Sequence, residues 1–446
     1  MMTKNIPARN KNIASKSDAA SDAASRDGAA SDAESKVTLL MPFIKYASKN
    51  KQIILQSAKE FGTPQYLLDE RLLLENVASL KSEFKRQIPK SRIFYAFKSN
   101  DLPYIIRLLK DNGINADVSC MFEMQLALRY GFKDVIYTAP YKSDDEILLA
   151  LQNNVVLNID NDVEFTKVAL ACQKHNLDAK ISFRIRNACK PWKKFGMELG
   201  SFVNLAKKAM KNPRMSWTGV HFHSSWNNDS ITYEDNLKII TDCLKDNFTQ
   251  KELSQLRFID IGGGLMPFES VNIDENFIMP SSIKEFAKNI GTAVKTNIHD
   301  KLNINPEIWL EPGRMICSTS TMILLKVDSI KDDESITDGA INMLGDSIFE
   351  EEYFPVMNIS RPSLKLNKGK INGPLCDPSD HWGEWYFGDM LKEGDIVAVQ
   401  NQGAYTFSTA WRWQRPIPRY VSFKDDKLTV VKLEENLEER YSGCRF

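Results

Sequence analysis

The sequence has no excess of charge of either sign. Its 446 residues include 58 Lys and Arg against 58 Asp and Glu, so the formal net charge is zero. Proteins that bind nucleic acid or an anionic membrane surface usually carry a strong field of positive charge. The balanced composition therefore argues against both kinds of partner and favours a small-molecule ligand.

Cysteine and histidine are too few and too scattered to suggest a disulfide framework or a zinc site. The seven cysteines are odd in number and form no C-x-x-C pair, which favours a reducing compartment such as the cytoplasm. His221 and His223 share one face of a predicted strand, but no acidic residue or cysteine has the spacing of a third ligand. We therefore expect no metal site.

Long apolar runs are also absent. No stretch of about 18 apolar residues exists to span a membrane, and the beginning of the sequence lacks the apolar core of a secretion signal. Residues 1–36 have a basic beginning followed by repeated Ser, Ala and Asp, and the aspartates argue against a transit peptide. We expect this low-complexity segment to be disordered, because it has too little apolar surface to offset the entropy lost on ordering.

The remaining sequence is long enough and, at 43% apolar residues, hydrophobic enough for two domains. Strand and helix patterns alternate eight times, as in the segment after residue 101, where Pro103 suits a first helical turn and Gly113 an end. Eight such units predict an α/β domain, a (β/α)8 barrel of the TIM type over residues 66–315, with its chemistry at the carboxyl ends of the strands. The predicted strands begin near residues 93, 115, 134, 155, 180, 217, 258 and 306.

The helical period disappears after Arg314. The runs T-M-I-L-L-K-V-D, D-I-V-A-V-Q and K-L-T-V-V-K-L are of strand type and are separated by clusters of Asp, Gly and Pro. They predict a second, mostly β domain over residues 316–446. Upstream of the barrel, we interpret T-L-L-M-P-F as a short extended piece, followed by a helix and a strand.

One stretch, Ile93–Asn100, points to chemistry. Its aromatic and apolar residues predict a strand that ends in Lys98, so the amine should face a cavity. Removal of water disfavours an ammonium ion and so favours the neutral, nucleophilic amine that a Schiff-base lysine needs. These eight residues alone fit an ordinary lysine at a strand end better, and the choice depends on the rest of the chain.

The octet I-F-Y-A-F-K-S-N resembles the Y-A-V-K-x-N motif of the alanine-racemase-like, or fold-type III, pyridoxal-phosphate enzymes. The resemblance is to their decarboxylases of ornithine, lysine, arginine and diaminopimelate. Further segments match this group in the same order: A-D-V-S-C at 116–120, F-H-S-S at 222–225, D-I-G-G-G at 260–264, E-P-G-R at 311–314, and G-P-L-C-D at 373–377 with G-A-Y-T at 403–406.

The resemblance implies pyridoxal 5'-phosphate as the cofactor, because decarboxylation leaves a carbanion whose electrons need a protonated pyridine ring. Lys98 would hold the cofactor aldehyde, and Glu311 would bond to the pyridine nitrogen and keep it protonated. His223 would stack on the ring. Asp117, Arg184 and Glu123 match residues near the cofactor's other substituents.

A phosphate site is implied as well. Gly262, Gly263 and Gly264 follow a predicted strand, and residues without side chains let backbone N–H groups close around a phosphate. Arg314 and Tyr405 match further phosphate contacts of the family. Without the order of the motifs, an ordinary turn would be the better interpretation of the three glycines.

Two positions after His223 the sequence departs from the family. Ser225 stands in place of a glycine, and Trp226 stands where a phosphate-binding serine is expected. That phosphate contact is lost unless Ser224 or Ser225 substitutes for it.

The resemblance also bears on assembly and substrate. Cys376 would deliver a proton to the α-carbon and Asp377 would meet the distal amine of the substrate, both in the neighbouring subunit's site, so an obligate homodimer is implied. Asp377 resembles the ornithine type, whereas the diaminopimelate type usually has Glu followed by Ser after the cysteine. Asp346 is a second candidate for the amine, with Glu350, Glu351 and Glu352 as alternatives. In this family the N-terminal segment, here residues 37–65, packs with the β domain.

The favoured interpretation is a lyase of polyamine biosynthesis that decarboxylates a basic or diamino acid, ornithine or lysine first, to a diamine and carbon dioxide. An alternative substrate is diaminopimelate or an intermediate of siderophore or antibiotic synthesis, which would explain the unusual segments Ser224–Trp226 and His381–Phe387. A third possibility is an inactive regulatory homologue, although the residues expected to bind the cofactor are present.

Overall fold

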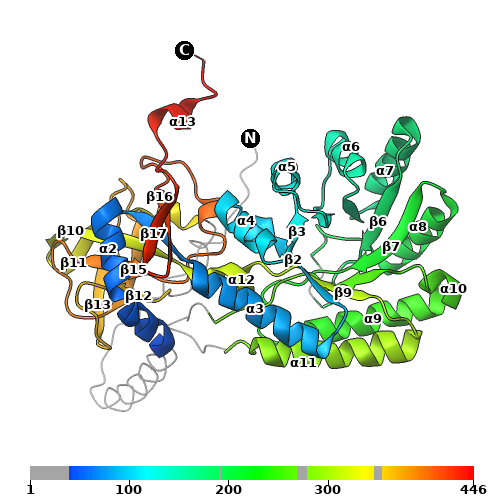
Figure 1. Cartoon of the computed structure of the whole chain (residues 1–446), viewed down its shortest axis with the longest axis horizontal. Coiled ribbons are helices and arrows are strands. Elements are labelled where there is room, and N and C mark those ends of the chain that lie inside the picture. The colour runs from blue at the N-terminus through cyan, green and yellow to red at the C-terminus, as the bar shows by residue number, and fades with distance from the viewer. Residues whose placement is uncertain (1–39, 190–191, 269–278, 346–353, 446) are drawn as a thin grey trace, which may run out of the picture.

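The computed structural model describes residues 40–189, 192–268, 279–345 and 354–445. Within these ranges the chain forms a closed eight-stranded barrel with helices around it, and a nine-stranded sheet beside it (Figure 1). The prediction of a TIM-type barrel with a second, mostly β domain is therefore confirmed. Residues 1–36, predicted to be disordered, lie outside the described residues.

All neighbouring strands of the barrel are parallel, and each begins within two residues of the predicted position. Strands of a parallel sheet are buried on both faces, so their sequences are nearly continuous apolar runs. This pattern made the strands recognisable in the sequence. The strands are β2 (Ser91–Ala96), β3 (Asn115–Val118), β4 (Val135–Thr138), β5 (Val156–Ile159), β6 (Ala179–Arg184), β7 (Met215–His221), β8 (Phe258–Asp260) and β9 (Glu307–Leu310).

The helices of the barrel begin at recognisable signals. Ser143 and Ser282 each form a capping box with the glutamate three residues later, and Pro103 occupies the first turn of its helix. No described helix is long and apolar enough to cross a membrane. The helices are α3 (Glu70–Gln87), α4 (Pro103–Asp111), α5 (Met121–Arg129), α6 (Asp144–Gln152), α7 (Asp162–His175), α8 (Leu199–Lys211), α9 (Ile231–Asn247), α10 (Gln250–Leu253) and α11 (Ile283–Val294).

An aromatic floor closes the interior of the barrel. Phe94, Ile136, Phe258 and Trp309 form one buried cluster, in which the Phe258 and Trp309 rings stack at 3.5 Å between centroids. Alternate residues of a strand face the same side, so the residues two positions further along also point inward. These are mostly polar, and they form the base of the candidate site: Thr138, Asn158, Asp260 and Glu311.

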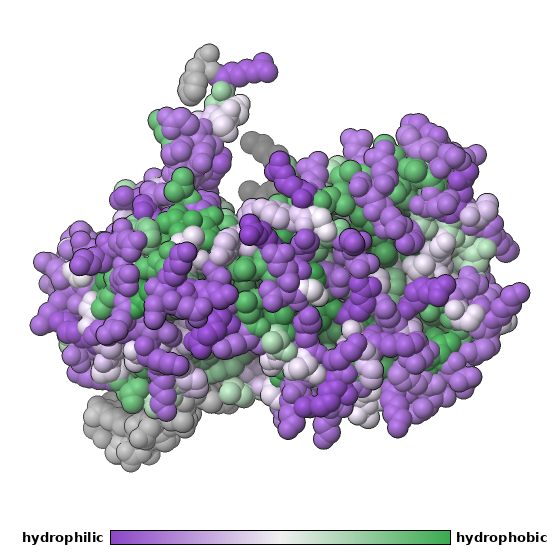
Figure 2. Space-filling model, in the orientation of Figure 1, coloured by the Kyte–Doolittle hydropathy of each residue, from purple (hydrophilic) through white to green (hydrophobic). Residues whose placement is uncertain are grey.

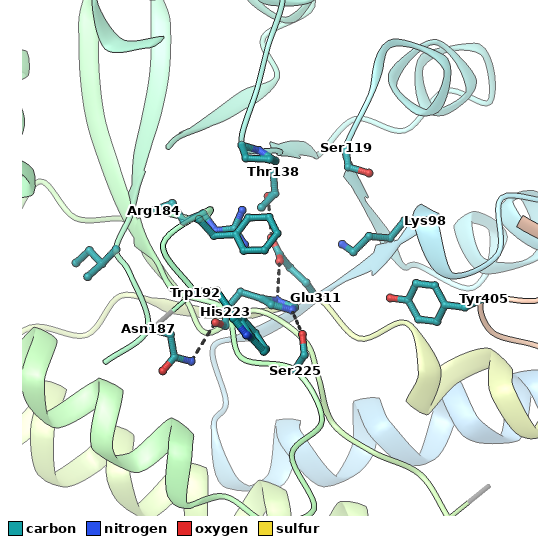
Figure 3. A pocket seen from close by; sticks show the side chains of 13 residues that line it. Lys98, Ser119, Thr138, Arg184, Asn187, Trp192, His223, Ser225, Glu311 and Tyr405 are labelled. Carbon is teal, nitrogen blue, oxygen red and sulfur yellow. Dashed lines mark hydrogen bonds and ion pairs between the residues drawn. The ribbon is translucent and has the colours of Figure 1, made fainter. Parts of the chain in front are cut away.

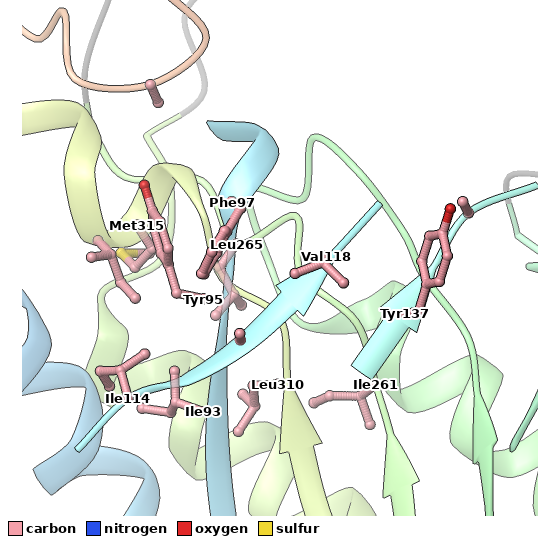
Figure 4. Close-up of a cluster of buried hydrophobic side chains, with 14 of the residues drawn as sticks. Ile93, Tyr95, Phe97, Ile114, Val118, Tyr137, Ile261, Leu265, Leu310 and Met315 are labelled. Atoms are coloured by element: carbon pink, nitrogen blue, oxygen red, sulfur yellow. The ribbon is translucent and has the colours of Figure 1, made fainter. Parts of the chain in front are cut away.

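The other face of each strand packs against the helices. Ile93 and Tyr95 of β2, Val118 of β3 and Tyr137 of β4 belong to this larger core (Figure 4). The surface is mostly hydrophilic, and hydrophobic residues come to the surface where the two domains adjoin (Figure 2). The polar interior of the barrel is thus held between an aromatic floor and an apolar outer core.

The β domain combines the two ends of the chain. β1 (Gln65–Asp69) lies between β10 (Thr321–Lys331), which is antiparallel to it, and β16 (Arg419–Lys424), which is parallel. The N-terminal segment that enters this sheet therefore reaches Asp69 rather than residue 65. The other strands are β11 (Glu334–Thr337), β12 (Val356–Asn358), β13 (Leu366–Asn372), β14 (His381–Phe387), β15 (Ile396–Val399) and β17 (Lys427–Lys432).

The segment before β1 is helical. Residues 40–49 and α2 (Lys51–Phe61) are both helices, so the extended piece predicted for T-L-L-M-P-F is wrong from residue 40 onward. Leu40, Ile44 and Ile54 pack into one cluster with side chains of the sheet. The spacing of Leu40 and Ile44 suits one helical face, and packing on the sheet stabilises that face.

The unusual segment His381–Phe387 is strand β14 in the interior of this sheet. Trp382 and Tyr386 are buried there, and the Trp382 indole N–H donates to the carbonyl oxygen of Gly339 at 2.9 Å. These rings therefore pack inside the β domain and do not line the cavities described below.

Candidate active site

Two adjoining cavities lie at the carboxyl ends of the barrel strands. One has a volume of about 250 Å³ and the other about 210 Å³. Figure 3 shows Lys98 and Tyr405 on one side of the larger cavity and Arg184 on the other, with His223 and Glu311 between them. Both cavities are lined by Lys98, His223, Ser225, Glu311 and Tyr405.

Lys98 enters the larger cavity from the turn η1 (Phe97–Ser99) that follows β2. Its Nζ lies 3.1 Å from Oδ2 of Asp117, which is buried at the end of β3. A loop of the β domain anchors the turn, because the Tyr405 N–H donates to Ser99 O at 2.7 Å and the Ser408 hydroxyl to Lys98 O at 3.0 Å. The site is therefore built where the two domains meet.

The electrostatics around Lys98 differ from the sequence prediction. Burial lowers the pKa of the amine, as expected, but the opposite effect of Asp117, Tyr405 and Glu311 is larger, and the pKa of Lys98 is raised. The prediction that burial alone makes this amine neutral is therefore wrong. The acidic groups come from three different segments, so their combined field on Lys98 is a property of the fold.

The pKa of the Asp117 carboxyl is also raised. Burial and the charge of Glu311 raise its pKa to about 8, against the lowering effect of Lys98. Its Oδ1 is buried and has no hydrogen-bond partner among the described residues. Glu123 lies close by in α5 and accepts bonds from the backbone and hydroxyl of Ser119. The unpartnered oxygen of Asp117 leaves an acceptor beside Lys98 for a ligand.

Glu311 is the central carboxylate of the site. It follows β9, accepts a bond from the Thr138 hydroxyl at 3.0 Å, and pairs with Nε2 of His221 at 3.2 Å. Burial opposes ionisation, but His221, Lys98 and His223 together lower the pKa of Glu311 below the ordinary value of a glutamate. Glu311 is therefore ionised, and its carboxylate can accept a hydrogen bond from a cationic or N–H group of a ligand.

The His223 imidazole is neutral and its tautomer is defined. Burial and the positive charges of Lys98 and Arg184 hold the pKa of His223 well below its ordinary value. Nδ1 accepts the Gly263 N–H at 3.1 Å, so Nε2 carries the hydrogen and donates it to the Ser225 hydroxyl, also at 3.1 Å. A fixed neutral ring of this kind presents a flat face for stacking.

Arg184 ends β6 and completes the far side of the larger cavity. Its guanidinium bonds to Asp160 at 3.4 Å and lies 4.6 Å from the centroid of the Phe195 ring. The paired, mostly buried guanidinium gives this wall a fixed positive charge.

The three glycines after β8 serve mainly to bring backbone segments together. A Cβ at Gly263 would lie 2.1 Å from Glu311 O, and one at Gly264 would lie 1.9 Å from Ser224 O. The Gly262 N–H donates to Asp260 and the Gly263 N–H to His223, and only Gly264 lines a cavity. The prediction that all three glycines face the phosphate is therefore wrong for Gly262 and Gly263.

Arg314 and Trp226 line the smaller cavity together with Gly264 and Tyr405. Ser225 lines both cavities and already accepts the His223 bond, whereas Ser224 is buried and donates to Asn227 at 2.8 Å. Of the two candidate substitutes for the missing serine, only Ser225 faces the cavities.

Several predicted residues lie elsewhere. Cys376 and Asp377 sit on the loop after β13, with Cys376 exposed, and line neither cavity of their own chain. The Asp377 carboxylate accepts bonds from the backbone and hydroxyl of Ser379. Asp346 and the alternatives Glu350, Glu351 and Glu352 fall outside the described residues.

Some lining residues were missed in the sequence. Thr138 could have been found, because it follows the inward-facing Ile136 by two positions on a predicted strand. The others lie on loops, where no periodicity applies: Ser119, Pro140, Asn187, Trp192 and Phe195.

The sequence argument against a metal site overlooked contacts between strands. His221, Asp260 and Glu311 hold their possible ligand atoms within 4.8 Å of one another, so acidic partners do lie beside His221. Burial and the charge of Glu311 raise the pKa of Asp260 well above its ordinary value. His221 bonds to Glu311, and Asp260 accepts the Gly262 N–H at 2.9 Å, so the three groups form a buried polar layer under the cavity.

The groups around the cavities fit pyridoxal 5'-phosphate. A lysine amine suits its aldehyde, an ionised glutamate its pyridine nitrogen, a neutral imidazole its ring face, and a guanidinium its phosphate. The unpartnered oxygen of Asp117 leaves one further acceptor beside the lysine. Fold and site together define a pyridoxal-phosphate enzyme built on a TIM-type barrel.

The chain belongs to the pyridoxal-dependent decarboxylases. Residues 74–318 match the family model described as "Pyridoxal-dependent decarboxylase, pyridoxal binding domain". The protein is thus an amino-acid decarboxylase, a lyase, that uses pyridoxal phosphate. This result argues against the inactive regulatory homologue.

Relatives match along most of the chain. The diaminopimelate decarboxylase of Methanothermobacter thermautotrophicus is 26% identical over 410 residues, which cover 87% of this chain and 93% of the relative. The crystal structure of diaminopimelate decarboxylase from M. jannaschii has a TM-score of 0.79 at 24% identity, covering 88% of this chain and 94% of that one. The Helicobacter pylori enzyme (I148L mutant), crystallised with L-lysine, has a TM-score of 0.76 at 26% identity and covers 87% and 98%.

These comparisons do not support the interpretation that the chain is closest to the ornithine and lysine type. That interpretation depended on Asp377, a single residue on an exposed loop. Similarity spread over the whole chain outweighs one position.

Proposed function

We propose that this chain decarboxylates diaminopimelate to lysine and carbon dioxide. The observation that carries the proposal is that relatives matching 85–89% of the chain are named diaminopimelate decarboxylases. L-lysine, present in the H. pylori structure, is diaminopimelate less one carboxyl group. The alternative stated for the sequence is therefore preferred over ornithine or lysine as substrate, and the product belongs to amino-acid rather than polyamine synthesis.

Each residue of the site would have a separate role in the reaction. When bound, pyridoxal phosphate supplies the electron sink for the carbanion. Lys98 holds the aldehyde, Glu311 keeps a proton on the pyridine nitrogen, and the neutral His223 ring supports one face. Arg314 and Tyr405 bind the phosphate together with the backbone at Gly264.

Asp117 would control the charge on Lys98. The carboxyl is 3.1 Å from the amine, so it can take up or return a proton as the amine changes its bonding partner. A pKa of about 8 leaves both protonation states accessible near neutral pH.

We propose further that two copies of the chain share their active sites. Glu311 is the only carboxylate among the described residues that line the cavities, and it is committed to the cofactor. We infer that the acid for the distal ammonium group lies outside these lining residues. Asp377 of a second copy is the candidate, with Cys376 beside it as the proton donor, and Asp346 is the second candidate. An acid at this point would select substrates that have a distal ammonium group over those that lack one. A buried charged group without its partner is costly, so either one alone would bind poorly.

The rim of the barrel supports this assembly. Phe122, Tyr141 and Trp192 follow β3, β4 and β6 at the mouth of the barrel, and they are 83%, 69% and 44% exposed. Large exposed apolar side chains beside a binding site are typical of a surface that another protein covers. The second copy would cover this rim. The scattered cysteines favour the cytoplasm as the location of the dimer.

The substrate is tested with purified protein, pyridoxal phosphate and a panel of amino acids: the meso, LL and DD forms of diaminopimelate, L-ornithine, L-lysine and L-arginine. The amine formed and the carbon dioxide released are both identified. We expect lysine from one form of diaminopimelate. Putrescine from ornithine, or cadaverine from lysine, as the main product would overturn the proposal in favour of the first sequence interpretation.

The shared site is tested by mixing two inactive variants, Lys98→Ala and Cys376→Ala, after dissociation and reassociation. If each site combines Lys98 of one copy with Cys376 of the other, mixed dimers regain one intact site, about a quarter of wild-type activity overall. No recovery in a mixture that forms dimers would place both residues in one subunit's site.

A further inference from the structure

Arg314 contacts two aromatic rings. Its guanidinium carbon is 4.5 Å from the ring centroid of Trp226 and 4.8 Å from that of Tyr405. The three residues come from distant segments: the loop after β7, the start of α12 (Arg314–Cys317) and the β-domain loop. All three line the smaller cavity. Arg314 therefore presents its charge to this cavity with two aromatic rings against it.

The backbone of both ring residues is unusual. Trp226 has φ of 60° and Tyr405 has φ of 57°, in the left-handed region. Among the described residues, the other positive-φ positions that are not glycine are all Asn or Asp, which tolerate this conformation well, except Gln414. A bulky residue there carries strain, and strain of this kind gathers at ligand clamps. The two strained aromatics are the two that flank Arg314.

We propose that Trp226 and Tyr405 form a clamp that orients Arg314 to bind the cofactor phosphate. Trp226 is thereby a positioning residue that takes the place of the serine hydroxyl expected at this point. The phosphate is held here by an oriented charge rather than by an added hydroxyl donor. This inference rests on the proposed position of the phosphate beside Arg314 and Gly264.

Stacking can replace a hydroxyl for a physical reason. A free arginine side chain loses much rotational freedom when it binds an anion, and a side chain already fixed by two rings has less to lose. The rings also cover part of the guanidinium, so its attraction for a phosphate is screened less on that side. The cost is the strained backbone at residue 226, which glycine would relieve.

The test measures binding to the apo-protein without catalysis. Pyridoxine 5'-phosphate and pyridoxine carry no aldehyde and cannot bond to Lys98. The dissociation constant of pyridoxine divided by that of pyridoxine 5'-phosphate therefore measures the preference for the phosphate. We expect Trp226→Ala to reduce this ratio roughly three- to thirty-fold, the range of a desolvated cation–π contact, and Trp226→Phe, which keeps a ring, to restore most of it. Arg314→Ala should abolish the preference for the phosphorylated probe.

Trp226→Gly separates this role from ordinary packing. Both variants lose the ring, but glycine also relieves the backbone strain, so Trp226→Gly should melt at or above the melting temperature of Trp226→Ala while its phosphate preference falls to the same extent. A lower melting temperature with an unchanged preference would make Trp226 a packing residue and overturn the inference. If Arg314→Ala also leaves the preference unchanged, the phosphate lies elsewhere and the proposed cofactor position fails as well.

Discussion

The Lys98 amine and the Asp117 carboxyl lie 3.1 Å apart, and the environment raises the pKa of both groups. For Lys98, the surrounding acids outweigh burial. For Asp117, burial and Glu311 outweigh the attraction of the amine. The Lys98 amine is therefore held as a cation, while the Asp117 carboxyl changes its protonation state near neutral pH.

Asp117→Asn should change how stability depends on pH. With its pKa raised to about 8, Asp117 keeps a proton in the folded protein over a range where the unfolded chain has lost it. The free energy of unfolding then decreases as pH rises from about 4 to 8, by at most about 1.4 kcal/mol per pH unit. Urea unfolding of the apo-protein at several pH values should show that wild type minus variant falls across this window. A difference that rises would mean that the ion pair with Lys98 dominates.

Lys98→Ala should remove the absorbance of the bound cofactor near the visible edge and reduce turnover at least about a thousand-fold, because the covalent anchor is lost. Lys167→Ala is a matched control, since Lys167 is 37% exposed and pairs with Asp144 at 3.0 Å, much as Lys98 is 36% exposed and pairs with Asp117. Absorbance spectra and single-turnover assays of both variants measure cofactor binding and the rate of decarboxylation. Full turnover in Lys98→Ala would contradict the assignment of the site.

Thr138→Val should destabilise the protein by about 1–3 kcal/mol, because buried Glu311 and Asn158 each lose a hydrogen-bond partner. Thr241→Val is the control: its hydroxyl is buried in α9 with no hydrogen-bond partner in the described part of the chain, so an apolar replacement should be neutral or stabilising. Thermal melts of the apo-proteins test the pair. Equal losses in both variants would mean that the bond to Glu311 contributes nothing.

Gly264→Ala should cost about 2–5 kcal/mol, because its Cβ would overlap Ser224 O and its φ of 85° is strained for alanine. Gly131→Ala, at the end of α5, has a similar φ of 74° but nothing within 4 Å of the added carbon, so only the conformational cost of about 1 kcal/mol applies. Denaturant midpoints of the two variants measure the difference. Similar midpoints would show that the backbone at Ser224 moves away freely.

The sequence by itself determined the architecture and the order of the main groups. Strand and helix periods are local, so all eight barrel strands were located within two residues. Lys98 and Glu311 were recognised because their motifs resemble those of a known family. Both follow strands, and in a parallel barrel the ends of all strands meet at one face. The N-terminal helix at residues 40–49 was missed because its apolar face is stabilised by the sheet it packs on, a contact that no local pattern records.

Only the tertiary structure decided the pKa values in the site and which side chains contact one another there. The charges that raise the pKa of Lys98 belong to separate segments, and their effect depends on distances set by closure of the barrel. For the same reason His221 and Asp260 meet Glu311, and Trp226 meets Arg314, although these residues are far apart in the chain. Spacing along a sequence reports neighbours within one element, whereas pKa values and ring stacking depend on separations in space between elements.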